Sequence, residues 1–285
     1  MIPSAFDYVR AGTVDEAVAA LVAGGEDAKV LGGGQSLIPV LRLRLNNPSL
    51  IVDVSRVDEM RSIVDEGSSL LIGAAVTTDA VMKDAGVQAD IPLLAITAAT
   101  VADRAIRHRG TFGGSCAHAD PAGDLPTVAQ ALDAEFVIAG PGGRRTVAAK
   151  EFFLDFFTTA VGPDEVLVAV RVPKLGAGWG VNYQKFQRTA QAWAIVGVAA
   201  AVKTEGGTIT GARIALTNMG ATPIRASSVE AALIGGPATI EAIKAASASA
   251  ADGTKPTSDT HATADFRSHL ARVHTARAVA KAAGI

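Results

Sequence analysis

Two glycine-rich segments contain the residues best suited to bind a charged ligand. The first covers residues 32–36 with the sequence GGGQS, and the second covers residues 111–115 with the sequence TFGGS. In each segment adjacent glycines stand beside a small hydroxyl residue, and the missing Cβ atoms let backbone N–H groups approach an anion closely. Together the two segments predict a clamp on one diphosphate group.

Each segment taken alone also has a structural interpretation, because tight strand-to-helix turns use glycine for backbone geometry. The first segment partly matches a Rossmann fingerprint with Asp53 downstream, but Leu37 occupies the position of the third glycine. The second resembles the nucleophile elbow of a hydrolase around Ser115. However, His118 and Asp124 follow that serine in the wrong order and too closely for such a triad. Neither alternative is favoured.

Hydrophobic spacing predicts the elements that position these segments. A capping-box pattern starts a helix at residues 13–21, and residues 29–31 lead into the first glycine-rich loop. The second glycine-rich segment is expected to be another loop, following helices at 78–85 and 93–104. Also predicted are a short helix at 37–45, a strand at 50–54, a hairpin at 62–73, a helix at 127–132, and strands at 135–139, 144–147 and 166–172.

A change of composition at residues 173–178, PKLGAG, marks the best domain boundary. It predicts a first domain over residues 1–175, with subdomains of about 1–55 and 56–175, and a second, α+β domain over 178–285. The second domain is predicted to contain strands at 182–187, 193–203 and 208–217, followed by helices at 227–233, 240–251 and 264–283.

The two glycine-rich segments, in this order and spacing, resemble those of the FAD-binding subunit of the molybdenum hydroxylases, the family of aerobic carbon monoxide dehydrogenase and xanthine dehydrogenase. The resemblance covers nearly the whole chain. It implies an α+β fold, with a two-part FAD-binding domain of the p-cresol methylhydroxylase/vanillyl-alcohol oxidase type before a smaller α+β C-terminal domain of the carbon monoxide dehydrogenase flavoprotein type. It also implies one FAD, bound noncovalently, since no His or Cys stands in a recognised flavin-attachment motif.

The resemblance assigns FAD contacts residue by residue. At the position of Asp124 the family holds the adenosine portion with an aspartate, and Asp120 is a second candidate. Leu167 matches a position that packs on the adenine or flavin end. From the residues alone, Asp124 could instead cap a helix, and Leu167 could be a core leucine. The residues implied to bind the pyrophosphate through backbone and hydroxyl groups are Gly32, Gly33, Gly34, Gln35, Ser36, Thr111, Gly113, Gly114 and Ser115.

Residues 183–197 resemble the family's strand and adjoining loop beside the isoalloxazine ring. The resemblance implies that Trp193 covers one ring face by offset stacking and that Lys185 stabilises the negative charge of a reduced flavin. An interface tryptophan and a surface lysine are the alternatives. The sequence TAQA at residues 189–192 departs from the family's Arg-rich, Asp-containing pattern, which leaves the electron acceptor open.

The family's assembly implies partners for this chain. The substrate would be oxidised at molybdopterin on a large subunit, [2Fe-2S] clusters would lie on a small subunit, and this FAD would pass electrons to an external acceptor. A dimer of heterotrimers is expected. The first-loop motif and the chain length favour the carbon monoxide dehydrogenase branch over xanthine and aromatic-heterocycle dehydrogenases. A free-standing flavin oxidoreductase and a non-enzymatic nucleotide-binding module are the other hypotheses.

Composition argues against several other classes of protein. The formal net charge of −2 offers no basic excess for nucleic acid. A single cysteine, Cys116, cannot form an internal disulfide or ligate an iron–sulfur cluster by itself. The longest apolar stretch, residues 192–202, is shorter than the roughly 20 residues of a membrane-spanning helix and predicts a buried strand. The N-terminal residues do not match a secretion signal. We therefore expect a cytoplasmic protein, with attachment to the inner membrane face through its complex left open.

The remaining titratable residues predict no metal site. The five histidines form no convincing set with carboxylates or cysteine, and His269 and His274 are expected on a solvated helix. Arg107 and Arg109 precede the second glycine-rich segment and could supply positive charge near a pyrophosphate. Surface ion pairs are the alternative for both arginines.

Overall fold

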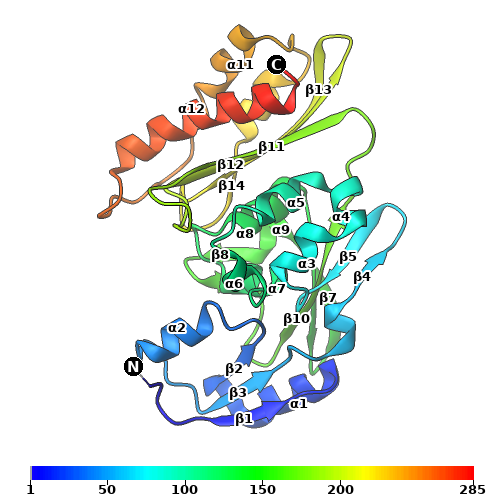
Figure 1. Ribbon diagram of the computed structural model, residues 1–285, viewed down its shortest axis with the longest axis vertical. Coiled ribbons are helices and arrows are strands. Elements are labelled where there is room, and N and C mark those ends of the chain that lie inside the picture. The colour runs from blue at the N-terminus through cyan, green and yellow to red at the C-terminus, as the bar shows by residue number, and fades with distance from the viewer. Residues whose placement is uncertain (1) are drawn as a thin grey trace.

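The computed structural model describes residues 2–285 as an elongated molecule (Figure 1), whose N-terminal lobe lies at the bottom, whose middle domain follows, and whose C-terminal domain lies at the top. The lobe contains a parallel sheet in which β3 (Leu50–Asp53) lies between β1 (Asp7–Arg10) and β2 (Ala28–Leu31). Two helices, α1 (Val14–Gly24) and α2 (Leu37–Arg42), connect the strands.

The middle domain is built on a five-stranded antiparallel sheet of order β4-β5-β10-β6-β7. Helix α7 packs on β10, and α1 of the N-terminal lobe also packs on β10 and β6. The strands are β4 (Ile63–Asp65), β5 (Ser69–Gly73), β6 (Glu135–Gly140), β7 (Gly143–Ala148) and β10 (Val166–Pro173), with a small hairpin of β8 (Phe153–Asp155) and β9 (Thr158–Thr159). The helices are α3 (Thr78–Lys83), α4 (Ala85–Asp90), α5 (Pro92–Ala98), α6 (Arg104–Arg107), α7 (Phe112–His118), α8 (Asp124–Ala131) and α9 (Ala149–Phe152).

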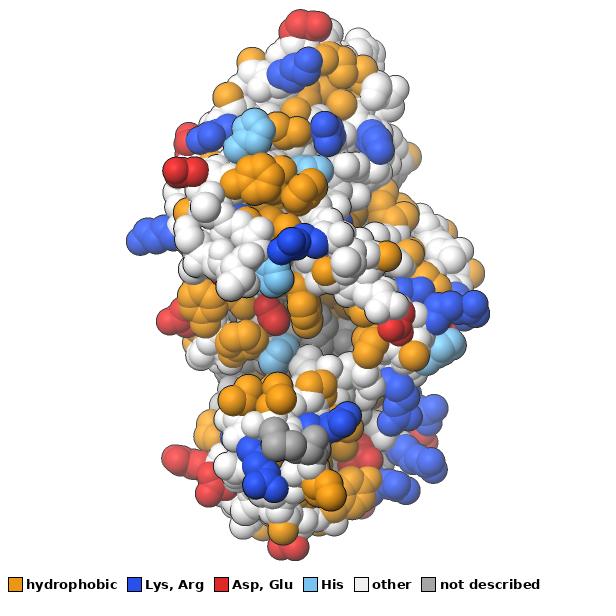
Figure 2. Space-filling view, turned by 60° about the vertical axis from the view of Figure 1, so that its left-hand side comes forward, with side chains coloured by type: hydrophobic (Ala, Val, Ile, Leu, Met, Phe, Trp, Pro, Cys, Tyr) orange, Lys and Arg blue, Asp and Glu red, His pale blue; other side chains and the backbone are white. Residues whose placement is uncertain are grey.

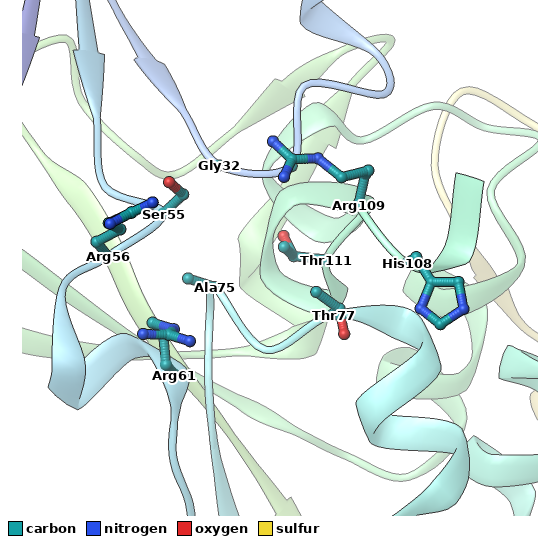
Figure 3. Close-up of a pocket in the computed structure, with 10 residues that line it drawn as sticks. Gly32, Ser55, Arg56, Arg61, Ala75, Thr77, His108, Arg109 and Thr111 are labelled. Carbon is teal, nitrogen blue, oxygen red and sulfur yellow. The ribbon is translucent and has the colours of Figure 1, made fainter. Parts of the chain in front are cut away.

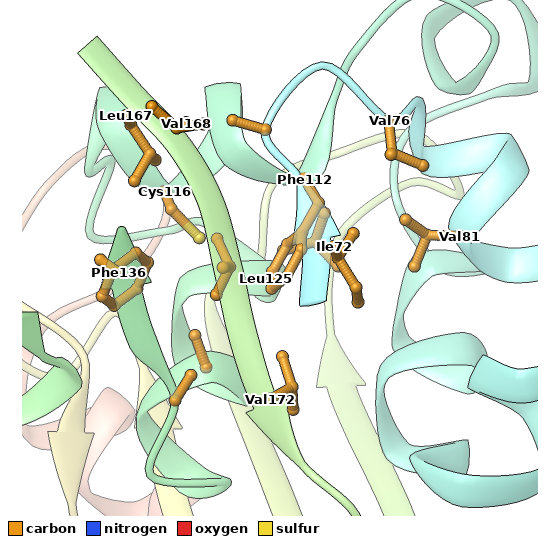
Figure 4. Close-up of a cluster of buried hydrophobic side chains, with 14 of the residues drawn as sticks. Ile72, Val76, Val81, Phe112, Cys116, Leu125, Phe136, Leu167, Val168 and Val172 are labelled. Carbon is orange, nitrogen blue, oxygen red and sulfur yellow. The ribbon is translucent and has the colours of Figure 1, made fainter. Parts of the chain in front are cut away.

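The core of this part lies between the sheet and α7 and α8 (Figure 4), where Phe112 and Cys116 stand close to side chains of β5 and β10. Cys116 is fully buried, and burial raises the pKa of its thiol. It is therefore a small core residue with no access to solvent, as expected. Leu167 of β10 belongs to the same buried cluster.

The C-terminal domain carries three helices on an antiparallel sheet of order β11-β12-β13-β14. In β12, Val198 and Val202 point into the core beneath these helices, whereas Ala199 and Ala201 join the core of the middle domain. Small alanines on that face let α5 and α8 approach the sheet closely. The elements are β11 (Trp179–Phe186), β12 (Val196–Glu205), β13 (Thr208–Thr217), β14 (Ile224–Arg225), α10 (Ser227–Leu233), α11 (Ile240–Ser247) and α12 (Ala264–Ala282).

Several predicted elements differ from the structure. The helix expected over residues 93–104 ends early: α5 stops at Ala98, a turn with Ala102 at a φ of 40° follows, and Asp103 caps the separate helix α6. Trp193 lies before β12 rather than in it. His274 is buried against Phe186 rather than solvated, and burial lowers the pKa of its imidazole. Among the helices of residues 2–285, none is long and apolar enough to cross a membrane.

Candidate functional site

A cavity of about 380 Å³ lies where the N-terminal lobe meets the middle domain (Figure 3). Four separate stretches of chain contribute to it, and both glycine-rich segments are among them. The lining residues are Gly32, Gly33, Ser55, Arg56, Arg61, Ala75, Thr77, His108, Arg109 and Thr111.

Sheet register explains why two of these stretches meet. Leu31 at the end of β2 pairs with Asp53 at the end of β3, so Gly32 and Ser55 leave the parallel sheet at the same edge. Ligands of α/β proteins commonly bind outside the carboxyl ends of parallel strands. Ser55 and Arg56 were missed from the sequence, although they directly follow the strand predicted at 50–54.

The first glycine-rich segment touches the residues directly before the second one, beside the cavity. A Cβ atom on Gly33 would overlap the Arg109 carbonyl and would lie 2.8 Å from Cα of Gly110. The Gly110 carbonyl in turn accepts a hydrogen bond of 2.8 Å from the backbone N–H of Thr78. Gly33 is therefore required for the close approach of these two chain segments.

The second segment is not a loop, contrary to the prediction, but the first turns of α7. Thr111 is the N-cap, and its hydroxyl accepts a hydrogen bond of 2.9 Å from the backbone N–H of Gly114. Gly113 is needed for packing, because a Cβ there would lie 2.7 Å from the Ala74 carbonyl oxygen. Thr111 lines the cavity, whereas Gly113, Gly114 and Ser115 continue into the helix. Only the N-cap residue of α7 thus reaches the cavity.

The charge around the cavity is positive. Arg56, Arg61 and Arg109 all line it together with His108, and no Asp or Glu does. Figure 2 shows Lys and Arg side chains gathered along the right-hand side of the lower half of the molecule. Guanidinium groups and bare backbone N–H groups form the donor set that binds phosphate oxygens best. Arg107, the other arginine candidate, is turned away, since its Nη1 donates to the Val101 carbonyl at 2.8 Å.

The remaining residues of the first glycine-rich segment, 34–36, stabilise the turn between β2 and α2. Gly34 has a φ of 74°, a conformation that favours glycine, and the Gln35 side-chain amide donates to the Gly33 carbonyl at 3.3 Å. Ser36 precedes α2 without capping it through its side chain. These residues shape the loop beside the cavity but do not line it.

A second polar cluster lies at the junction of the middle and C-terminal domains. The Lys185 ammonium is 2.7 Å from an Asp124 carboxylate oxygen, and their side chains are 6% and 3% exposed. The Tyr183 hydroxyl donates to the other oxygen at 2.6 Å, and the Lys185 ammonium also donates to the Thr100 carbonyl at 3.2 Å. Burial raises the pKa of Asp124, while Lys185 and Tyr183 oppose that rise. Burial and the Asp124 charge raise the pKa of Tyr183.

This ion pair joins two residues that the resemblance assigned to different parts of FAD, Asp124 to the adenosine portion and Lys185 to the isoalloxazine ring. Asp124 does not cap α8 through its side chain, although it is the first residue of that helix. The pairing could not be read from the sequence, because 61 positions separate the two residues.

The other candidates lie apart from the cavity lining. Asp120 accepts a hydrogen bond from the Ala122 backbone N–H at 2.9 Å and so stabilises the turn before α8. Leu167 is a buried core side chain. Trp193 is 58% exposed, in the segment between β11 and β12.

Comparison with known proteins identifies the family. The model of the FAD binding domain in molybdopterin dehydrogenase matches residues 4–175, and that of the CO dehydrogenase flavoprotein C-terminal domain matches residues 181–282. The chain belongs to this flavoprotein family. The resemblance read from the sequence and the α+β fold it implied are thereby confirmed, and FAD is the cofactor of the family's N-terminal domain.

Several relatives match over nearly their full length. The chain is 40% identical to the carbon monoxide dehydrogenase medium chain of Hydrogenophaga pseudoflava, over 98% of this chain and 97% of that one. It is 38% identical to the 6-hydroxypseudooxynicotine dehydrogenase complex subunit alpha of Paenarthrobacter nicotinovorans, over 99% and 96%. The structure of the Hydrogenophaga pseudoflava carbon monoxide dehydrogenase that lacks the Mo-pyranopterin moiety aligns with a TM-score of 0.97 and 43% identity, covering 100% of this chain and 99% of that one.

Proposed function

We propose that this chain is the medium subunit of a heteromeric carbon monoxide dehydrogenase-type enzyme and holds FAD as its electron carrier. The observation that carries the proposal is the convergence of Gly33, the Thr111 cap and three arginines on one cavity between two subdomains. That set fits a diphosphate, which is the part of FAD that needs cations and bare backbone. When bound, FAD would accept and release electrons one or two at a time.

The residues of this chain would bind and orient the cofactor. Arg56, Arg61 and Arg109, with the backbone N–H groups of Gly32 and Gly33 and the Thr111 cap, would hold the pyrophosphate. We place the Asp124–Lys185 pair at the isoalloxazine end, because Lys185 lies on β11 just before the segment that carries Trp193. Asp124 would then fix the position of the Lys185 ammonium rather than bind adenosine.

The names of the relatives, a medium chain and a complex subunit, support the presence of partner subunits. We infer that the partners are a large molybdopterin subunit and a small iron–sulfur subunit, and that the complex is a dimer of heterotrimers. We place the complex in the cytoplasm, where it could also attach to the inner face of the membrane. Carbon monoxide is the first substrate to test, because a relative named for it aligns over nearly the whole chain. Xanthine and aromatic heterocycles are the second class, supported by the similarity to subunits of heterocycle-oxidising complexes.

The experiment is anaerobic reduction of the purified complex by candidate substrates. If the proposal is correct, carbon monoxide bleaches the flavin absorption of the complex but not that of this chain alone. Bleaching by xanthine or quinoline instead would assign the complex to the second class. Flavin reduction by substrate in the isolated chain would contradict the proposal and indicate a free-standing oxidoreductase.

Replacing Arg56 by glutamine is expected to weaken FAD binding without unfolding the protein. A charge-assisted hydrogen bond is worth about 1.5–3 kcal/mol, which corresponds to a loss of roughly tenfold or more in affinity. Titration of apoprotein with FAD, followed by protein fluorescence, measures the change. Arg144→Gln is the control, since it removes the same charge from a surface pair with Glu59 and does not line the cavity. Equal affinity in the two variants would remove Arg56 from the site.

Replacing Trp193 by alanine is expected to leave FAD bound and to raise flavin fluorescence. Aromatic stacking beyond burial contributes about 0.5–1.5 kcal/mol, too little to release a cofactor held through its diphosphate. Loss of an indole quencher and of a ring cover would also change reoxidation by small acceptors. Unchanged fluorescence and reoxidation in the flavinated variant would show that Trp193 does not cover the ring.

A further inference from the structure

A second cavity, of about 550 Å³, lies between α11 and α12 on the C-terminal domain. Its floor is apolar and includes Ile240, Ile243 and Val273. The remaining large lining side chains are basic, and no Asp or Glu lines the cavity. Figure 2 shows Lys, Arg and His side chains interspersed with hydrophobic ones on this upper part of the molecule.

The lining positions form one continuous face on each helix. They fall at 240, 243, 244 and 247 on α11, with Ala248 as its C-cap, and at 269, 272, 273, 276, 277 and 280 on α12. Spacings of three and four residues place side chains on the face that a helix normally buries against a neighbour. Yet Ile240, Val273 and Ala276 stay partly exposed. Two helices of this domain thus present an incompletely covered groove.

A buried polar atom also lacks a partner there. The Ser247 side chain is 1% exposed and lines the groove, and its hydroxyl has no hydrogen-bond partner within residues 2–285. A buried hydroxyl without a partner is unfavourable. The rim beside it is held in place, since Arg272 Nε donates to the Ala248 carbonyl at 3.1 Å and so links α12 to α11.

We propose that this groove, lined by α11 and α12, docks an amphipathic helix with acidic flanks from a partner subunit. The inference rests on the proposed function, which requires partner subunits. An apolar helix face would cover the floor, and carboxylates on both sides would pair with Lys244, Arg272 and Arg277. Pairing of this groove with the same groove of a second copy of the chain is disfavoured, because the basic side chains of the two copies would then face and repel each other.

Charge reversal in the assembled complex tests the proposal. Lys244→Glu and Arg277→Glu, each made in this chain co-produced with the large and small subunits, should weaken subunit association at least about tenfold. Native mass spectrometry over a dilution series measures the association. FAD content should be unchanged, since neither residue lines the cavity between the lobes. Lys255→Glu is the matched control, because Lys255 is exposed in the same domain and does not line the groove.

Zero-length cross-linking identifies the occupant. Cross-links from Lys244 to carboxylates of a partner helix would support the proposal, whereas cross-links to a second copy of this chain would overturn it. Assembly of Lys244→Glu and Arg277→Glu as complete as that of Lys255→Glu would also overturn it, while leaving FAD binding intact. If the wild-type chain binds no FAD and joins no partner subunits, the proposed function fails and this proposal fails with it.

Discussion

Replacing Gly33 by valine should reduce FAD content to less than about a tenth of the wild-type value, a loss exceeding 1.4 kcal/mol in binding. Any Cβ at this position overlaps the Arg109 carbonyl and crowds Gly110, so the first glycine-rich segment must move away from the residues that lead into the second. Separation moves Arg109 and Thr111 away from the first segment and opens the diphosphate site. The ratio of flavin absorbance to protein concentration in the purified variant measures the effect.

Gly142→Ala is the control for this experiment. Gly142 lies in the turn between β6 and β7, and a Cβ there would meet no atom within 4 Å. Flavin content and melting temperature should both match the wild type. If Gly33→Val retained full flavin occupancy, the contact between the two segments would not be part of the cofactor site.

Breaking the Asp124–Lys185 pair should destabilise the protein even without flavin. Removing one member of a buried ion pair leaves an uncompensated charge and costs about 3–5 kcal/mol. Lys185→Met should therefore lower the unfolding free energy of apoprotein by that amount, measured by urea titration. The double variant Asp124→Leu/Lys185→Met should be less destabilised than the sum of the single variants, because no unpaired charge remains.

Lys203→Met provides the contrast on the neighbouring strand. This substitution breaks the ion pair between Lys203 and Glu205, whose nitrogen and oxygen are 2.6 Å apart. Because both side chains are partly exposed, the unfolding free energy is expected to change by only about 0–1 kcal/mol. If Lys185 interacted only with the flavin, replacing it would leave the stability of the apoprotein unchanged. Equal stability of wild-type and Lys185→Met apoprotein would thus contradict the structural role of the pair.

Local signals in the sequence were sufficient to predict many of the helices and strands. Thr13 caps α1 as the capping-box pattern predicted, and the strand predicted at 208–217 is β13. The apolar stretch at 192–202 predicted a buried strand. That stretch is apolar because β12 is covered on both faces, with valines in one core and alanines in the other. In each case the sequence pattern that predicts the element lies within the residues that form it.

Other features depend on contacts that no local pattern records. Glycine lowers helix propensity, so α7 was predicted as a loop, yet the Thr111 cap and the packing of Gly113 on Ala74 stabilise the helix. β1 was missed because all four of its residues are exposed and show no alternation. The convergence of Arg56 and Arg61 with the glycine-rich segments arises from tertiary packing, as does the pairing of Asp124 with Lys185.

Identification of the released cofactor tests the central claim most directly. The purified native protein is denatured, and the supernatant is separated by chromatography against FAD, FMN and NAD standards, with the protein concentration measured in parallel. The account predicts one FAD per chain and no flavin left on the denatured polypeptide. Recovery of FMN, NAD or no cofactor, or flavin retained covalently on the chain, would contradict it.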